Sequence, residues 1–112
     1  MHVLIAGAGP AGASLAVQLA EAGWAVTLAD ALPSPERNAY SSAALHLVDA
    51  DRLGIPGACR SASWWVWQLL DPDGLEHQWW AADPQGVVLD FSAFRQHLWA
   101  QAWPSAVELL NG

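Results

Sequence analysis

The sequence contains no lysine, and its four basic residues are all arginines. Without lysine, the chain lacks both the phosphate-binding lysine of a Walker motif and an amine for Schiff-base chemistry. Asp and Glu together number 11, which gives a formal net charge of −7. Such a chain has too few cations to contact a row of phosphates, so we expect no nucleic-acid partner.

Cysteine is equally scarce. The single Cys59 excludes an intrachain disulfide and fits a reducing cytoplasm, which is the expected location. We expect its side chain to be a small buried group rather than a reactive thiol. The four histidines have no spacing typical of metal ligands, so we expect no metal site.

A long uninterrupted apolar run is also missing. Residues 3–20 are largely apolar, but no Lys or Arg precedes them, and Gly, Pro and Gln interrupt them. This pattern argues against a signal peptide and against a membrane span. We therefore expect no membrane association.

What the chain does contain is a glycine-rich turn between two apolar segments. An apolar stretch at residues 2–5 is followed by the turn at residues 7–12, and a helix is expected from residue 10 to residue 22. Residues 25–29 form a second apolar stretch that ends at Asp30. Strand, glycine turn, helix, strand and terminal acid form the βαβ unit of dinucleotide-binding proteins.

Each position in the turn has a physical role. Gly7 permits the tight turn, Gly9 leaves space for a pyrophosphate, and Gly12 allows close packing of the helix on the strand. Pro10 and Ala11 begin the helix, whose free N–H groups would bind the phosphates.

The acid at the end of the second strand is expected to bind a ribose. Asp30 follows Gly12 by eighteen residues, close to the spacing of about 20 typical of the residue that binds the ribose diol. A carboxylate there repels a 2′-phosphate, which disfavours NADP, whereas FAD and NAD both fit. Arg37, in the Pro-containing loop after Asp30, either contacts the adenosine or phosphate edge or is a solvated charge. The candidate cofactor-binding residues are Gly7, Gly9, Pro10, Ala11, Gly12, Asp30 and Arg37.

Beyond this unit the pattern is mixed. In chain order we expect a helix from Ser41 or Ser42 to Leu53, strands at residues 63–70 and 75–80 joined by a turn at 71–74, a strand at 87–89, a helix at 92–103 and a strand at 106–110. Eight tryptophans either pack within the fold or line an aromatic substrate pocket in a larger protein, and packing is the favoured interpretation. Together they present more apolar surface than a domain of this size readily buries, which indicates missing chain.

Two stretches together carry a family resemblance. Residues 5–30 with residues 86–98 resemble FAD-dependent oxidoreductases of the aromatic-hydroxylase superfamily, which includes flavin monooxygenases, geranylgeranyl reductase-like enzymes and tryptophan-halogenase-like proteins. Residues 58–64 and 83–86 are most similar to the halogenase-related branch. The resemblance implies FAD as the cofactor. Phe91 stands where this family usually has Arg, and Arg95 where it usually has Asp.

The expected fold is therefore α/β: a partial Rossmann-like FAD/NAD(P)-binding domain of the three-layer ββα type, with an inserted β-hairpin and an incomplete sheet. Residues 1–112 are interpreted as the N-terminal part of that domain, without a substrate domain, so a complementary C-terminal chain is a candidate partner. The expected function is that of an FAD-binding segment, monooxygenase-like or halogenase-like, inactive alone and without an identifiable catalytic residue. The alternatives are an NAD-binding Rossmann protein and a non-catalytic remnant or interaction module.

Overall fold

The structure, a computed structural model, describes residues 1–37, 42–102 and 107–111. The chain forms two compact units. One consists of Met1–Tyr40 and Phe91–Gly112 and is called the glycine-turn unit below. The other, Ser41–Asp90, is called the insertion unit.

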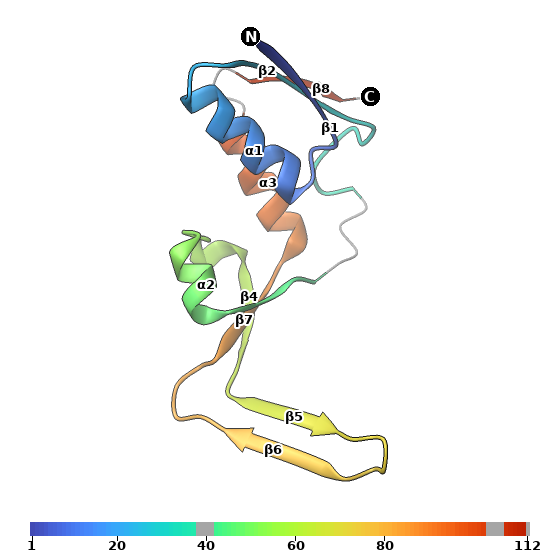
Figure 1. The fold of residues 1–112 in the computed structure, drawn as a ribbon, viewed down its shortest axis with the longest axis vertical. Coiled ribbons are helices and arrows are strands. Elements are labelled where there is room, and N and C mark those ends of the chain that lie inside the picture. Colours follow the sequence, from blue (N-terminus) through green and yellow to red (C-terminus); the bar gives the residue numbers. More distant parts are fainter. Residues whose placement is uncertain (38–41, 103–106, 112) are drawn as a thin grey trace. The chain divides into compact units, whose positions relative to one another are not determined.

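The glycine-turn unit contains a three-stranded parallel sheet in the order β1-β2-β8. Its strands are β1 (His2–Ala6), β2 (Ala25–Asp30) and β8 (Val107–Asn111). Helix α1 (Pro10–Glu21) connects β1 to β2, helix α3 (Phe91–Ala102) precedes β8, and both helices lie on one face of the sheet (Figure 1). This is the incomplete Rossmann-like α/β arrangement expected from the sequence.

The core of this unit lies between the sheet and the two helices. Ala13 and Ala16 on α1 are fully buried, and because these side chains are small, the helix lies close to Leu28 in the central strand. The buried cluster consists of Ala8, Ala13, Ala16, Val26, Leu28, Leu98, Trp99 and Ala102. Residues from both ends of the unit, Ala8 and Trp99 among them, thus share one core.

The opposite face of this sheet is largely exposed. Successive strand side chains point to opposite faces, and in β1 the exposed set is His2, Leu4 and Ala6. Leu4 is 68% exposed, and Leu110 in β8 is 51% exposed. Within this unit, therefore, the described helices cover only one face of the sheet. Of the three layers expected for the ββα type, the unit contains the helical layer and one sheet.

The insertion unit contains an antiparallel sheet in the order β3-β7-β4. Its strands are β3 (Ala44–His46), β7 (Gly86–Leu89) and β4 (Arg60–Trp64), with helix α2 (Leu47–Arg52) following β3 and a 3₁₀ turn at Gly57–Cys59. The buried hydrophobic residues are Ala50, Ile55, Cys59, Val87 and Leu89.

The predicted hairpin is confirmed as β5 (Val66–Leu70) and β6 (Glu76–Trp80). Gly74 has φ +83° in the connecting turn, and the Gly74 amide donates to the Asp71 carbonyl at 3.0 Å. The Asp71 carboxylate accepts from the amides of Asp73 and Leu75 at 3.0 and 2.9 Å. The turn is thus held by the Asp and Gly residues that predicted it.

Two sequence-based predictions in this unit are wrong. The helix expected from Ser41 or Ser42 to Leu53 begins only at Leu47, because Ala44–His46 is a strand paired with β7; Ser41 lies outside the described residues. The strand expected at residues 63–70 is two strands separated at Trp65, because β4 pairs with β7 and β5 pairs with β6. In both cases a partner distant in sequence overrides the local pattern.

The remaining elements agree with the expectations. The strand at residues 87–89 is β7, the helix at 92–103 is α3, and the strand at 106–110 is β8, although Trp103 and Ala106 lie outside the described residues. Among residues 1–37, 42–102 and 107–111, no helix has the length and apolar character needed to cross a membrane.

Four of the tryptophans are more exposed than the favoured interpretation as packing residues predicts, although Trp67 and Trp79 contact neighbouring rings. Trp65, Trp67, Trp79 and Trp80 are 45–76% exposed. Trp99, at 5% exposed, is buried in the core as expected.

Candidate functional site

The chain leaves β1 through a glycine whose backbone conformation is rare for other residues. Gly7 has φ +103°, and its N–H donates to the carbonyl oxygen of Ala29 at 2.7 Å. A side chain at this position would be strained even though no atom lies within 4 Å of the place its Cβ would take. Gly7 therefore fixes the turn to the end of β2.

Gly9 leaves the start of α1 open. It is the N-cap residue, with extended backbone angles, and no side chain caps the helix. A Cβ built on Gly9 would meet no atom within 4 Å. Because the first N–H groups of a helix lack intrahelical acceptors and carry the positive end of the helix dipole, this start is suited to an anion. Pro10 and Ala11 form its first turn.

Gly12 has a packing role. A Cβ there would lie 1.9 Å from the carbonyl oxygen of Gly7 and 3.3 Å from Cγ2 of Ile5. Only glycine therefore lets α1 approach the turn so closely. Gly7 is required by its positive φ and Gly12 by close packing. Gly9 has neither restriction, and open space surrounds the place that its Cβ would take.

The carboxylate of Asp30 lies beside the glycine turn. Its Oδ2 accepts from the Ala8 amide at 2.7 Å, and its Oδ1 accepts from the Leu32 amide at 2.8 Å. Asp30 thus ties the turn to the loop after β2. Each carboxylate oxygen has a second acceptor position, which is what the hydroxyls of a ribose require.

Trp99 on α3 holds the same turn from the other side. Its indole Nε1 donates to the Ala8 carbonyl oxygen at 2.7 Å, in a buried hydrogen bond. Sequence reasoning assigned Trp99 only to packing. No local signal reveals this contact, because the two residues are separated by 91 positions.

Arg37 is exposed in the loop after β2, and its contribution to binding stays a prediction. Its carbonyl oxygen accepts from Nη1 of Arg95 at 2.9 Å. Arg95 itself is 6% exposed, and its Cζ lies 6.0 Å from the centroid of the Trp99 ring. Phe91, where the resembling family has Arg, is half-buried, with its ring centroid 6.3 Å from that of Phe94.

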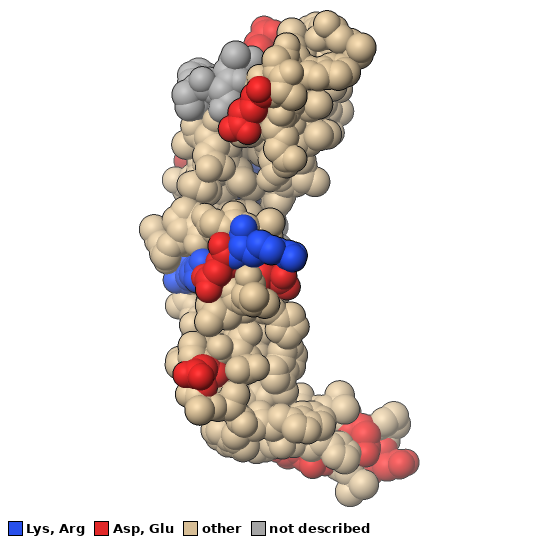
Figure 2. All heavy atoms as spheres, turned by 60° about the vertical axis from the view of Figure 1, so that its left-hand side comes forward, with Lys and Arg blue, Asp and Glu red and all other residues tan. Residues whose placement is uncertain are grey.

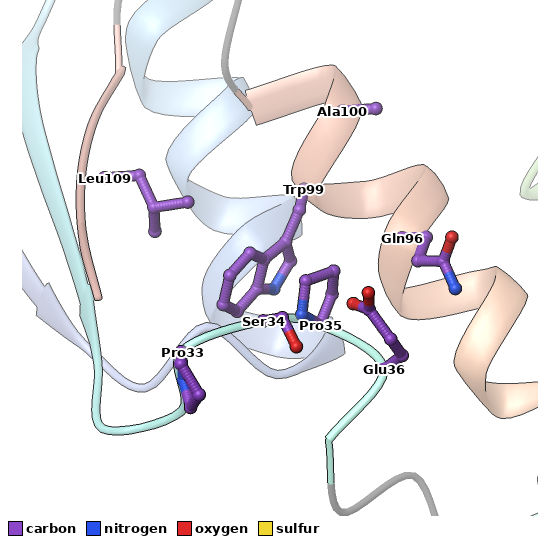
Figure 3. Close-up of a pocket in the computed structure, with 8 residues that line it drawn as sticks. All are labelled: Pro33, Ser34, Pro35, Glu36, Gln96, Trp99, Ala100 and Leu109. Atoms are coloured by element: carbon purple, nitrogen blue, oxygen red, sulfur yellow. The ribbon is translucent and has the colours of Figure 1, made fainter. Parts of the chain in front are cut away.

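A pocket of about 440 Å³ lies between the loop after β2 and α3 (Figure 3). Trp99 points from α3 toward the loop, and Leu109 adds an apolar side chain from β8. The lining residues are Pro33, Ser34, Pro35, Glu36, Gln96, Trp99, Ala100 and Leu109. Its volume and mainly apolar walls with a few polar groups are typical of small-molecule sites.

The insertion unit holds a second pocket, of about 380 Å³. Three of its lining residues are aromatic: His46 and Trp67, with ring centroids 5.7 Å apart, and Trp64, edge-on to Trp67 at 5.5 Å. The other lining residues are Ala44, Leu45, Val66, Gln68 and Val88.

Both arginines of the insertion unit form ion pairs. On the face drawn in Figure 2, acidic atoms are scattered and the basic atoms lie mainly beside acidic ones. Arg52 pairs with Asp49 at 3.1 Å and Arg60 with Asp51 at 2.8 Å. Among the described residues, no three His, Cys, Asp or Glu side chains lie close enough together to hold a metal ion.

Cys59 is buried in the insertion unit. Burial raises the pKa of its thiol, and the nearby charge of Asp90 raises it further. The prediction of a small buried side chain is confirmed, and a raised pKa is the opposite of what a reactive thiol needs.

Comparison with known proteins supports a nucleotide site at this turn. A family described as an FAD binding domain matches residues 1–46. No curated protein sequence matches the chain significantly.

Several solved structures share the fold. A geranylgeranyl bacteriochlorophyll reductase-like protein from Thermoplasma acidophilum superposes with TM-score 0.83 and 19% identity, over 98% of this chain and 29% of that chain. PqsL from P. aeruginosa, in complex with 2-aminobenzoylacetate, has TM-score 0.70 and 19% identity, over 99% of this chain and 34% of that chain. The peptidyl tryptophan dihydroxylase QhpG has TM-score 0.65 and 24% identity, over 97% of this chain and 24% of that chain. This chain thus spans about a quarter to a third of their lengths.

These findings define the class of site. The fold is the Rossmann-like α/β fold of FAD-binding domains, and the family match over residues 1–46 supports FAD as the cofactor. The residues present fit that group, because Gly9 leaves room at an uncapped helix start and Asp30 lies beside it. The individual roles of Gly7, Gly9, Pro10, Ala11, Gly12, Asp30 and Arg37 in binding stay predictions.

Proposed function

We propose that this chain is the segment that binds the ADP half of FAD in a flavin-dependent oxidoreductase, monooxygenase-like or halogenase-like, and that it is inactive alone. One observation carries the proposal: the open start of α1 at Gly9 lies in the same turn that the Asp30 carboxylate contacts through Ala8. Phosphate and ribose are the two groups that such a pair of features binds.

Each residue has a binding role in this proposal. The amides at the start of α1 hold the diphosphate, Asp30 accepts from the ribose hydroxyls, and the pocket lined by Trp99 and Pro33 receives the adenosine end. The bound flavin supplies the redox chemistry. The chain contributes affinity and orientation, and no general acid or base is assigned to it.

An aromatic substrate for the complete protein is supported by two features. The insertion unit has a pocket lined by His46, Trp64 and Trp67, whose ring faces can stack on a planar substrate. One similar structure is named a peptidyl tryptophan dihydroxylase, and another binds 2-aminobenzoylacetate. The halogenase-like variant of the proposal is supported by the resemblance of residues 58–64 and 83–86.

The need for a complementary C-terminal chain is supported by uncovered apolar surface. Leu4 and Leu110 are exposed on the open face of the parallel sheet, and Trp79 and Trp80 are exposed on the hairpin. Exposed apolar groups in such numbers are typical of surfaces that another chain segment covers. The lengths of the similar structures leave room for such a segment.

The test separates binding from folding with a matched pair of glycine variants. Gly9→Ala and Gly57→Ala both place a Cβ in open space, and neither position has a positive φ. We expect the 112-residue chain to bind FAD weakly, Gly9→Ala to weaken binding about tenfold or more by occupying the phosphate site, and Gly57→Ala to bind like the wild type. FAD fluorescence anisotropy measures the affinity, and circular dichroism verifies the fold.

Three results would contradict the proposal. The first is a wild-type chain that binds neither FAD nor ADP, and the second is a Gly9→Ala variant that binds FAD as tightly as wild type. The third is substrate-dependent oxidation of NADH or NADPH by the purified chain, which would contradict inactivity in isolation.

A further inference from the structure

Arg95 is a buried cation held by a neutral partner. It lies in the middle of α3 and is 6% exposed, and its described hydrogen bond runs from Nη1 to the carbonyl oxygen of Arg37. Its Nε is buried without a hydrogen-bond partner among the described residues. Burying a guanidinium in this way has a cost of several kcal/mol, so a role that offsets this cost is expected.

The carbonyl that Arg95 holds is the far end of the loop after β2. The near end of that loop is fixed by Asp30, which accepts from the amides of Leu32 and Ala8. Between the two ends, Pro33 and Pro35 restrict the backbone. The loop is thereby fastened at both ends, by a carboxylate at one and by a guanidinium at the other.

The fastened loop forms one wall of the pocket in Figure 3. Residues Pro33, Ser34, Pro35 and Glu36 face the α3 residues Gln96, Trp99 and Ala100 across it. Arg95 does not line the pocket, but the ring of Trp99, which does, lies 6.0 Å from its Cζ. Arg95 therefore acts on the pocket through the loop and through Trp99.

We infer that Arg95 is a positioning residue that holds the loop of residues 31–37 in the conformation required for the adenosine end of the cofactor. Arg95 and Arg37 are the two arginines of the glycine-turn unit, and Arg37 itself provides the carbonyl that Arg95 holds. This inference rests on the proposed FAD function for its second part, whereas the fixing of the loop stands independently.

Trypsin tests the loop directly, because the bond it cleaves after Arg37 includes the carbonyl that Arg95 holds. The chain has four tryptic sites, and Arg52, 77% exposed in the insertion unit, provides an internal reference. We expect Arg95→Gln to increase cleavage after Arg37 by about tenfold or more relative to cleavage after Arg52, because a hydrogen bond to a charged group is lost. Arg95→Lys keeps the charge and should restore part of the protection, and His97→Gln on the same helix should have no effect.

Two tryptic results would overturn the inference. If Arg95→Gln leaves the ratio of the two cleavage rates unchanged, Arg95 does not hold the loop. If it accelerates cleavage at all sites alike, its role is general stability rather than positioning.

Ligand binding tests the second part. Arg95→Gln is expected to raise the Kd of AMP and of FAD by the same factor, about tenfold or more, and to leave any affinity for FMN unchanged, because FMN lacks the adenosine half. A wild-type chain that binds neither AMP nor FAD contradicts the proposed function but leaves the tryptic result to decide the role of Arg95 in the loop. A wild-type chain that binds FAD, together with an Arg95→Gln variant of equal affinity, contradicts this inference and leaves the proposed function intact.

Discussion

The indole nitrogen of Trp99 donates to the carbonyl oxygen of Ala8 at 2.7 Å, so the third helix of the chain holds the first turn. Ala8 is 1% exposed, and its amide donates a hydrogen bond to the carboxylate of Asp30. Both backbone groups of one residue in the glycine turn are therefore fixed by side chains from other elements. The geometry of the turn depends on these contacts as much as on its glycines.

Replacement of Trp99 by Phe should destabilise the chain. The variant keeps an aromatic ring but leaves the buried Ala8 carbonyl without its donor, which costs about 1–3 kcal/mol. Chemical denaturation followed by circular dichroism measures the loss. The control is Trp80→Phe, because Trp80 is 76% exposed, and we expect it to change stability by less than about 0.5 kcal/mol. Equal effects of the two substitutions would contradict a specific role for the Trp99 hydrogen bond.

Gly12→Ala should be among the most damaging small substitutions. Its Cβ would lie 1.9 Å from the Gly7 carbonyl oxygen, which is backbone and cannot rotate away. We expect a loss of more than about 2 kcal/mol in the free energy of unfolding. Gly57→Ala adds the same methyl group in open space and serves as the reference in the same melting experiment. A Gly12→Ala variant as stable as the reference would show that α1 does not pack against the turn as described.

The hairpin turn should weaken in acid. A hydrogen bond from His77 and amide hydrogen bonds from Leu75, Asp73 and Gly74 hold the pKa of the Asp71 carboxyl below its usual range. A lowered pKa in the folded state means that the contribution of Asp71 to stability is present at neutral pH and is lost as the pH falls through that pKa. NMR titration of the Asp71 carboxyl carbon, followed together with the cross-strand signals of β5 and β6, measures both events.

Asp71→Asn is the control for this titration. It keeps an acceptor for the turn amides but removes the ionisable group, so the acid-dependent change in the hairpin signals should disappear. Signals of β5 and β6 that stay constant while Asp71 becomes protonated would contradict the role of its carboxylate in the turn.

Cys59 should react slowly in the folded chain. Burial and the charge of Asp90 raise the pKa of its thiol, so less thiolate is present at a given pH. We expect alkylation by iodoacetamide at least about tenfold slower than in denaturant, with the rate-against-pH curve displaced to higher pH. Because the pKa is raised by folding, the thiol stabilises the fold below its ordinary pKa, and this contribution is lost as the pH rises above it. Equal rates in buffer and in denaturant would place Cys59 at the surface.

The parts that could be predicted from the sequence are those whose cause is local. The turn at Gly7–Gly12 was predictable because backbone conformation, helix capping and close packing restrict residue type within a few positions. The hairpin was predictable for the same reason, since Asp71 and Gly74 form the turn from their own side chain and backbone.

The errors lie where a distant partner decides the structure. Ala44–His46 has helix-compatible residues but pairs with residues 86–88, some forty positions later. Similarly, Trp65 separates two strands because each side has a different partner, and no residue in residues 63–70 signals that change. Strand formation depends on cross-strand neighbours more than on intrinsic preference, so such segments are the least predictable.

By itself, the sequence determined the βαβ unit, the open helix start at Gly9, the acid at Asp30 and the hairpin turn, because the residue types that specify each of them lie within one short segment of the chain. Only the tertiary structure decided that Trp99 and Arg95 hold the turn and the loop around the candidate site, and which of the tryptophans are buried. The physical reason is that a buried polar side chain selects its partner by proximity in space, and the chain brings those groups together across separations of 58 and 91 residues.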